Sequence, residues 1–152
     1  MHFESEYQII RRQMENRLSV IQRSLFRDAQ AIENLETVVA GEGCGIEPPP
    51  ESGWVPFRAG GRWGGPDTTQ WFRATVVVPD AWEGERVFAV LAPGNEALCY
   101  VDGVPRQGLD HHRSHVLLRE SAKGGETISL LIDAYAKGEQ VFSVAQMCVQ
   151  DT

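Results

Sequence analysis

The residues best suited to binding chemistry lie in a stretch rich in tryptophan and glycine at positions 53–73. Three tryptophans, Trp54, Trp63 and Trp71, and five glycines fall within it. Tryptophan offers a flat apolar surface with one N–H donor, which suits the C–H face of a sugar, and glycine permits a close approach of the backbone. The stretch indicates a carbohydrate or partner surface on which Asp67 accepts hydrogen bonds from hydroxyls. The alternative is that the tryptophans fill one end of the core.

A second polar cluster contains three of the four histidines of the chain. A metal centre needs three or four ligands that converge on one point. His111 and His112 are adjacent and therefore diverge, and the apolar residues after His115 indicate a strand. We expect no metal site here, and we favour a polar loop that meets another domain or a sugar. The cluster comprises Asp110, His111, His112, Arg113, Ser114 and His115.

Familiar catalytic motifs are absent from the sequence. It contains no Gly-x-Ser-x-Gly elbow, no phosphate-binding Gly-x-x-x-x-Gly-Lys-Ser/Thr loop and no His-Glu-x-x-His. Carboxylate pairs for glycosidic cleavage are defined by their separation in space, so the sequence leaves them open. With only scattered acids, we expect no catalytic residue in this chain.

The first 40 residues carry an apolar pattern that differs from the rest. Its steps of three, four or seven predict one long amphipathic helix within an N-terminal unit spanning residues 1–40. We expect this helix to pack on the core of the parent protein. Self-association of two copies through a coiled coil is the weaker alternative, because the heptads are irregular. The apolar positions are Ile10, Met14, Leu18, Ile21, Leu25 and Ile32.

A Gly/Pro-rich hinge is expected over residues 41–56, and the apolar period then changes to 2. This period predicts a mainly β fold over residues 57–152, an antiparallel β-sandwich or jelly roll of the galactose-binding-domain type, preceded by the long N-terminal α-helix. Asp102-Gly103 between apolar runs predicts a type I′ hairpin, because both positions need positive φ. Strands are expected at 71–78, 86–92, 97–102, 104–107, 115–118, 127–134 and 140–149.

Charge and composition restrict the partners. The 14 basic and 21 acidic side chains give a formal net charge of −7, which argues against nucleic acid as a partner. No apolar run approaches the ~18 residues of a membrane span, and the acidic N-terminus lacks the apolar region of a signal peptide. Cys44, Cys99 and Cys148 fit neither a disulfide framework nor a zinc motif. We therefore expect reduced thiols and a cytoplasmic location.

Two motifs resemble the N-terminal domain of cytosolic-type α-mannosidases. The first, at positions 61–73, reads Gly-Arg-Trp-Gly-Gly-Pro-Asp-Thr-Thr-Gln-Trp-Phe-Arg and is followed by Val-Val-Val-Pro at 76–79. The second, at positions 96–110, reads Glu-Ala-Leu-Cys-Tyr-Val-Asp-Gly-Val-Pro-Arg-Gln-Gly-Leu-Asp and is followed by a histidine and the strand at 116–118. The resemblance covers about residues 50–150, and the first motif is the more specific.

The resemblance implies a glycan-processing role without catalysis by this chain. In that family a larger catalytic domain, similar to an α/β barrel, uses zinc and an aspartate nucleophile to cleave terminal α-mannosides with retention. Its zinc-binding His-x-Asp stretch has no counterpart here, so we expect no cofactor in this chain and zinc in the catalytic domain of the parent polypeptide. A free-standing module that binds mannose-containing glycans is the alternative. The residues expected to border the substrate cleft or dock the catalytic domain are Trp63, Asp67, Trp71, Asp110, His111 and His112.

Overall fold

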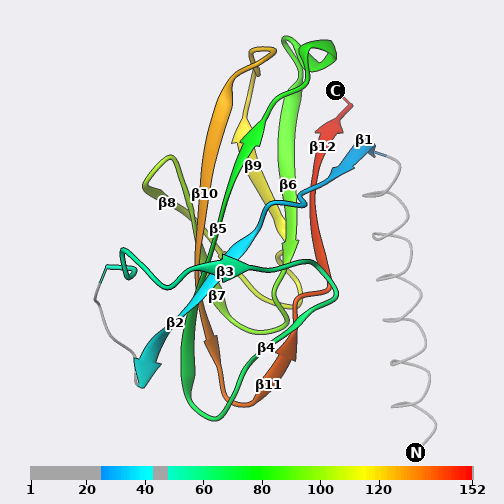
Figure 1. Cartoon of the computed structure of the whole chain (residues 1–152). Helices are drawn as coiled ribbons and strands as arrows, with labels where there is room; N and C mark the ends of the chain where they lie inside the picture. Colours follow the sequence, from blue (N-terminus) through cyan, green and yellow to red (C-terminus); the bar gives the residue numbers. More distant parts are fainter. Residues whose placement is uncertain (1–24, 43–47, 152) are drawn as a thin grey trace, which may run out of the picture.

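The computed structural model describes residues 25–42 and 48–151. The chain forms two antiparallel sheets that pack face to face, with a small two-stranded sheet at one end (Figure 1). This arrangement confirms the predicted antiparallel sandwich. The first sheet has four strands in the order β1 (Phe26–Ala31), β12 (Val144–Gln150), β6 (Arg86–Ala92) and β9 (His115–Arg119). The second has six in the order β3 (Val55–Pro56), β2 (Glu36–Glu42), β5 (Thr68–Val77), β10 (Thr127–Ala136), β7 (Ala97–Val101) and β8 (Val104–Leu109).

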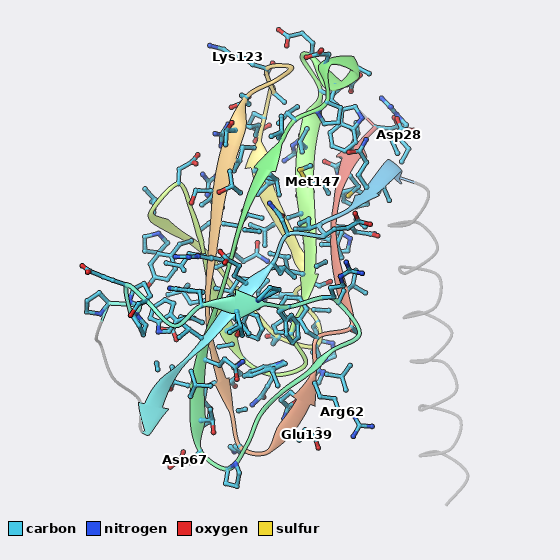
Figure 2. The ribbon with its side chains drawn as sticks, in the orientation of Figure 1. Asp28, Arg62, Asp67, Lys123, Glu139 and Met147 are labelled. Atoms are coloured by element: carbon cyan, nitrogen blue, oxygen red, sulfur yellow. The ribbon has the colours of Figure 1, made fainter. Side chains whose placement is uncertain are left out.

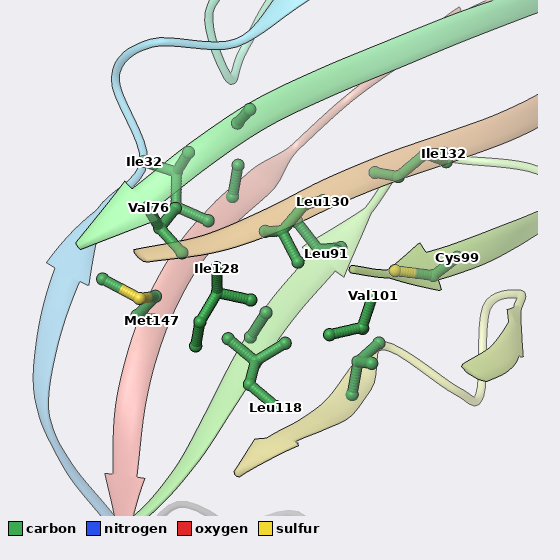
Figure 3. Packing of buried hydrophobic residues seen from close by; sticks show 14 of the residues in the cluster. Ile32, Val76, Leu91, Cys99, Val101, Leu118, Ile128, Leu130, Ile132 and Met147 are labelled. Carbon is green, nitrogen blue, oxygen red and sulfur yellow. The ribbon is translucent and has the colours of Figure 1, made fainter. Parts of the chain in front are cut away.

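Alternation along the strands divides the core from the outer faces. In β5, Phe72, Ala74 and Val76 are buried in the core, whereas Thr75 and Val77 are exposed on the opposite face. The predicted two-residue period is therefore confirmed for this strand. Ile128, Leu130 and Ile132 of β10 follow the same rule and meet Leu91 of β6 and Leu118 of β9 between the sheets (Figure 3).

Aromatic rings close one end of the core. Phe72 contacts Phe57, Trp63 and Phe142 with ring centroids 5.1, 5.3 and 5.0 Å away. All three contacts are edge-on, the geometry that the ring quadrupoles favour. Burial of each such side chain contributes about 1.5–3 kcal/mol, so this cluster is a principal source of stability at the end that carries the two-stranded sheet.

The structure confirms one predicted turn and divides one predicted strand into two. Asp102 and Gly103 have φ of 51° and 81°, which confirms the hairpin between β7 and β8. The strand expected at 140–149 is split into β11 (Glu139–Val141) and β12, because Phe142 turns into the core and exchanges backbone hydrogen bonds with Gly60 and Gly61. β11 pairs instead with β4 (Arg62–Gly64), where Arg62 lies 3.6 Å from Glu139 (Figure 2).

The predicted N-terminal helix is wrong from Phe26 onward. β1 pairs with β12 and β2 pairs with β5, so the chain before residue 57 already supplies strands to both sheets. Ile32, the last apolar position of the predicted helix, lies with Leu35 in the connection between β1 and β2, and both side chains enter the core from there. Residues 1–24, with the remainder of the predicted helix and its self-association, lie outside the described residues, as do positions 43–47 of the predicted hinge.

One short helical element joins the two sheets. It is the 3₁₀ turn η1 (Asp80–Trp82), which follows β5 and buries Trp82. Over residues 25–42 and 48–151, no helix has the length and apolar character needed to cross a membrane.

Candidate functional site

Trp63 is a core residue, which favours a structural role over the predicted ligand or docking surface. Its side chain is 4% exposed, and its indole N–H donates a 2.8 Å hydrogen bond to the carbonyl oxygen of Pro93. The ring also packs edge-on against Phe72. The indole therefore fills the end of the sandwich, the alternative that the sequence left open.

Trp71 lies on the outer face of the six-stranded sheet, but it is covered. It is 4% exposed, and its ring centroid lies 6.5 Å from that of Tyr100 on the same face. The next outward residue of β5, Arg73, stacks 4.0 Å over the ring of Trp54 and donates to Glu36 across 3.0 Å. An open indole platform for a sugar is thus not present at Trp71.

Asp67 is exposed in the turn between β4 and β5. Its φ is 49°, a left-handed conformation that aspartate tolerates better than most residues. The carboxylate accepts a hydrogen bond from the hydroxyl of Tyr135, which ties this turn to the end of β10. Asp67 therefore has a positioning role in the turn, and it lies at the two-stranded-sheet end of the molecule (Figure 2).

The Asp110 loop is organised by the side chain of its first residue. One Asp110 carboxylate oxygen accepts the backbone N–H groups of His112 at 2.7 Å and Arg113 at 2.8 Å. These bonds, that of His112 above all, hold the pKa of Asp110 below its usual value. The side chains of His111, His112 and Arg113 remain exposed at the turn that Asp110 fixes.

His112 and Arg113 line a groove of about 540 Å³ on the outer side of the four-stranded sheet. Phe26 of β1 packs edge-on against Phe88 of β6, with ring centroids 5.2 Å apart, and lies 4.8 Å from the ring of His115. Partial burial lowers the pKa of His115, which favours its neutral imidazole. The 110–115 loop and β1 thus form the sides of a groove that includes these aromatic rings.

The groove combines apolar rings with groups that hydrogen-bond. Gln107 from β8 and the guanidinium of Arg113 add donors beside the rings of Phe26 and Phe88. Aromatic surface with a few polar groups suits binding of a partner side chain or a sugar. Within residues 25–42 and 48–151, no group of three or more His, Cys, Asp or Glu side chains is arranged to hold a metal ion.

Sequence reasoning missed Phe26, Phe88 and Gln107. The alternation of side chains along β6 could have placed Phe88 on the outer face of the sheet. Its neighbours Val87 and Ala89 are fully buried, so the residue between them must lie on the other face. Phe26 was assigned to the helix and so could not be placed beside it. Gln107 reaches the groove only through the pairing of β8 with β7.

Comparison with known proteins identifies a family match. Residues 35–147 match the family model described as the jelly roll domain of α-mannosidase. The mouse protein α-mannosidase 2C1 is 27% identical over 110 residues, which cover 71% of this chain and 10% of that protein. The chain therefore spans about a tenth of the length of this curated relative.

Solved structures of other glycosidases share the fold. A mutant of Bacteroides uniformis β-glucuronidase 2 superimposes with a TM-score of 0.60 at 13% identity, covering 80% of this chain and 18% of that one. A putative β-galactosidase from Bacteroides fragilis gives a TM-score of 0.61 at 16% identity, covering 84% and 24%. At sequence identities this low, the superposition shows a shared fold and nothing further about function.

Proposed function

We propose, since this chain belongs to the family of α-mannosidase jelly roll domains, that it is a non-catalytic accessory domain of a longer polypeptide that hydrolyses terminal α-mannosides. The catalytic domain of that polypeptide would supply the nucleophile and hold the zinc ion. The two free thiols that the structure describes, Cys99 and Cys148, are both buried, which supports a reducing, cytoplasmic setting.

The specific role that we propose is to dock on that catalytic domain and border its substrate cleft through the Asp110 loop. The observation that carries this role is the position of the loop. It presents His111, His112 and Arg113 outward, and Asp110 fixes its backbone beside the groove formed by Phe26 and Phe88. Loops positioned by a rigid sheet are where binding residues tend to lie.

The test is the double substitution His111→Ala/His112→Ala in the full-length enzyme, assayed on an aryl α-mannoside. We expect kcat/KM to fall by about tenfold, equivalent to about 1.4 kcal/mol of transition-state stabilisation. Both side chains are exposed, so the thermal midpoint should be unchanged. Lys123→Ala is the matched control, because Lys123 is exposed at the other end of the sandwich from Asp67 (Figure 2). Unchanged kcat/KM together with unchanged thermal stability would contradict the proposal.

The same groove motivates a second candidate, a module that binds mannose-containing glycans by itself. The combination of the Phe26 and Phe88 rings with the amide of Gln107 favours it, because sugars stack on rings and hydrogen-bond to amides. Calorimetric titration of the isolated chain with α-mannobiose separates the two roles. Measurable affinity that is lost on Gln107→Ala favours the module, and absence of binding leaves the docking role.

A further inference from the structure

The outer face of the six-stranded sheet holds a carboxylate that has no partner among the described residues. Asp133 lies in β10, the strand between β5 and β7 in the sheet order. In the strand register it is opposite Trp71 on one side and Leu98 on the other. Its side chain is half-buried, and within residues 25–42 and 48–151 it forms no hydrogen bond or ion pair.

The contrast with Asp102 shows that this environment is unfavourable for a charge. Asp102 accepts the N–H of Ser129 and is paired with Arg119 at 2.8 Å, and these donors lower its pKa. Asp133 loses water without gaining a donor, so burial raises its pKa. The domain by itself therefore keeps a carboxylate where an amide or an apolar side chain would be less costly.

The surroundings of Asp133 are apolar and aromatic. Leu98, Tyr100 and Leu131 are half-buried on this face, and Trp71 is 4% exposed beneath its neighbours. These four residues and Asp133 are called the Asp133 face. A partly buried apolar surface with one unpaired charge has the composition of an interface centre that a partner covers.

An arginine of the neighbouring strand β5, on the same face, is already engaged. Arg73 of β5 is opposite Leu131 of β10 in the register, and Leu131 is two residues before Asp133 in β10. Its guanidinium stacks 4.0 Å over Trp54 and pairs with Glu36 at 3.0 Å. Arg73 thus shows how a guanidinium on this face pairs with a carboxylate and stacks on an aromatic ring together, whereas the carboxylate of Asp133 has no such cation among the described residues.

We propose that the Asp133 face packs against the catalytic domain of the longer polypeptide and receives from it an arginine side chain that pairs with Asp133. The inference rests on the proposed accessory function. Charge complementarity identifies the occupant, because a guanidinium is weakly hydrated, pairs with a carboxylate through two parallel bonds and stacks on aromatic rings. A strongly hydrated ammonium fits the half-buried apolar surroundings less well.

The experiment compares Asp133→Asn in two proteins, the 152-residue chain and the full-length enzyme. In the 152-residue chain, the thermal midpoint should stay the same or rise, because the substitution removes a desolvated charge. In the full-length enzyme, the midpoint should fall, and limited proteolysis between the two domains should accelerate by at least about tenfold, because the arginine loses its partner. The control is Glu96→Gln, which neutralises an exposed carboxylate in the loop before β7 and should leave both proteins unchanged.

A fall in the midpoint of the full-length enzyme without a fall in that of the 152-residue chain, with a silent control, supports the proposal. A fall in both proteins would show that Asp133 stabilises the domain itself, and a rise or no change in both would show that no cation meets it, so either result overturns the proposal. A different measurement tests the proposed accessory function, so its failure can be distinguished from failure of the Asp133 proposal. Unchanged kcat/KM in the His111→Ala/His112→Ala enzyme would remove the cleft-bordering role and leave the stability comparison at Asp133 intact.

Discussion

The indole N–H of Trp63 donates to the carbonyl oxygen of Pro93 across 2.8 Å, and this bond connects β4 to the residue that follows β6. Trp63→Phe would keep an aromatic ring but leave that buried carbonyl without its donor. We expect the free energy of unfolding to fall by about 1–3 kcal/mol. Urea denaturation followed by far-ultraviolet circular dichroism measures the change.

Trp54 provides a matched control for this prediction. Its indole N–H also donates to a proline carbonyl oxygen, that of Pro50, across 2.8 Å, but Trp54 is only half-buried. Water can replace the bond there, so Trp54→Phe should cost less than about 1 kcal/mol. Equal losses for the two substitutions would contradict the assignment of Trp63 to a structural role set by burial.

Arg119 connects three segments at the end of the sandwich opposite the two-stranded sheet. It pairs with Asp102 in the β7–β8 turn and with Glu126 before β10, each at 2.8 Å. Arg119→Met should lower the free energy of unfolding at pH 7 by about 1 kcal/mol, the scale of a partly exposed pair. Arg62→Met is the control, because the Arg62–Glu139 pair is longer, at 3.6 Å, and more exposed, and its loss should be close to undetectable.

The Arg119 contribution should depend on pH in one direction. A backbone hydrogen bond from Ser129 and the Arg119 guanidinium lower the pKa of Asp102, and a backbone bond from Lys123 with the same guanidinium lowers that of Glu126. Their stabilisation is therefore present above the unfolded pKa values of about 4 and is lost as the pH falls through the lower folded values. Urea titrations at pH 7, 5 and 3 should show the wild-type advantage over Arg119→Met shrinking only in the last step. An advantage that persists undiminished at pH 3 would rule out this account.

The sequence correctly predicted those elements that are determined by residues close together in the chain. Alternation in β5 and the Asp102-Gly103 turn depend only on neighbouring residues, and both agree with the structure. The helical pattern failed at Ile32, because spacing alone does not distinguish a helix from a loop residue that enters the core. The difference between Trp63 and Trp71, one in the core and one under the outer face, is set by which strands pair and not by local composition. The groove likewise needs β1, β12, β6 and β9 assembled in one sheet, which no single segment encodes.

The two cysteines that the structure describes should be unreactive in the folded protein. Burial raises the pKa of Cys99 to about 12 and that of Cys148 to about 11, so the thiolate is scarce at neutral pH. In a Cys44→Ser background, modification by a disulfide reagent at pH 7.5 should be at least about 100-fold slower in the native state than in urea. Rapid labelling of one thiol in the native protein would show that its strand opens or that its burial is incomplete.

Gly64 should be more sensitive to substitution than another glycine with the same backbone conformation. Its φ is +83°, and a Cβ added there would lie 2.7 Å from Cβ of Ala136 and 3.2 Å from the carbonyl oxygen of Gly138. Gly103 has φ of +81° but open space around the same position, so Gly103→Ala reports only the left-handed strain of about 1–2 kcal/mol. Gly64→Ala should cost more than Gly103→Ala, by an overpacking cost of about 1–3 kcal/mol. Urea denaturation of both variants tests this difference, and equal losses would mean that β10 and the β10–β11 turn move aside to accept the methyl group.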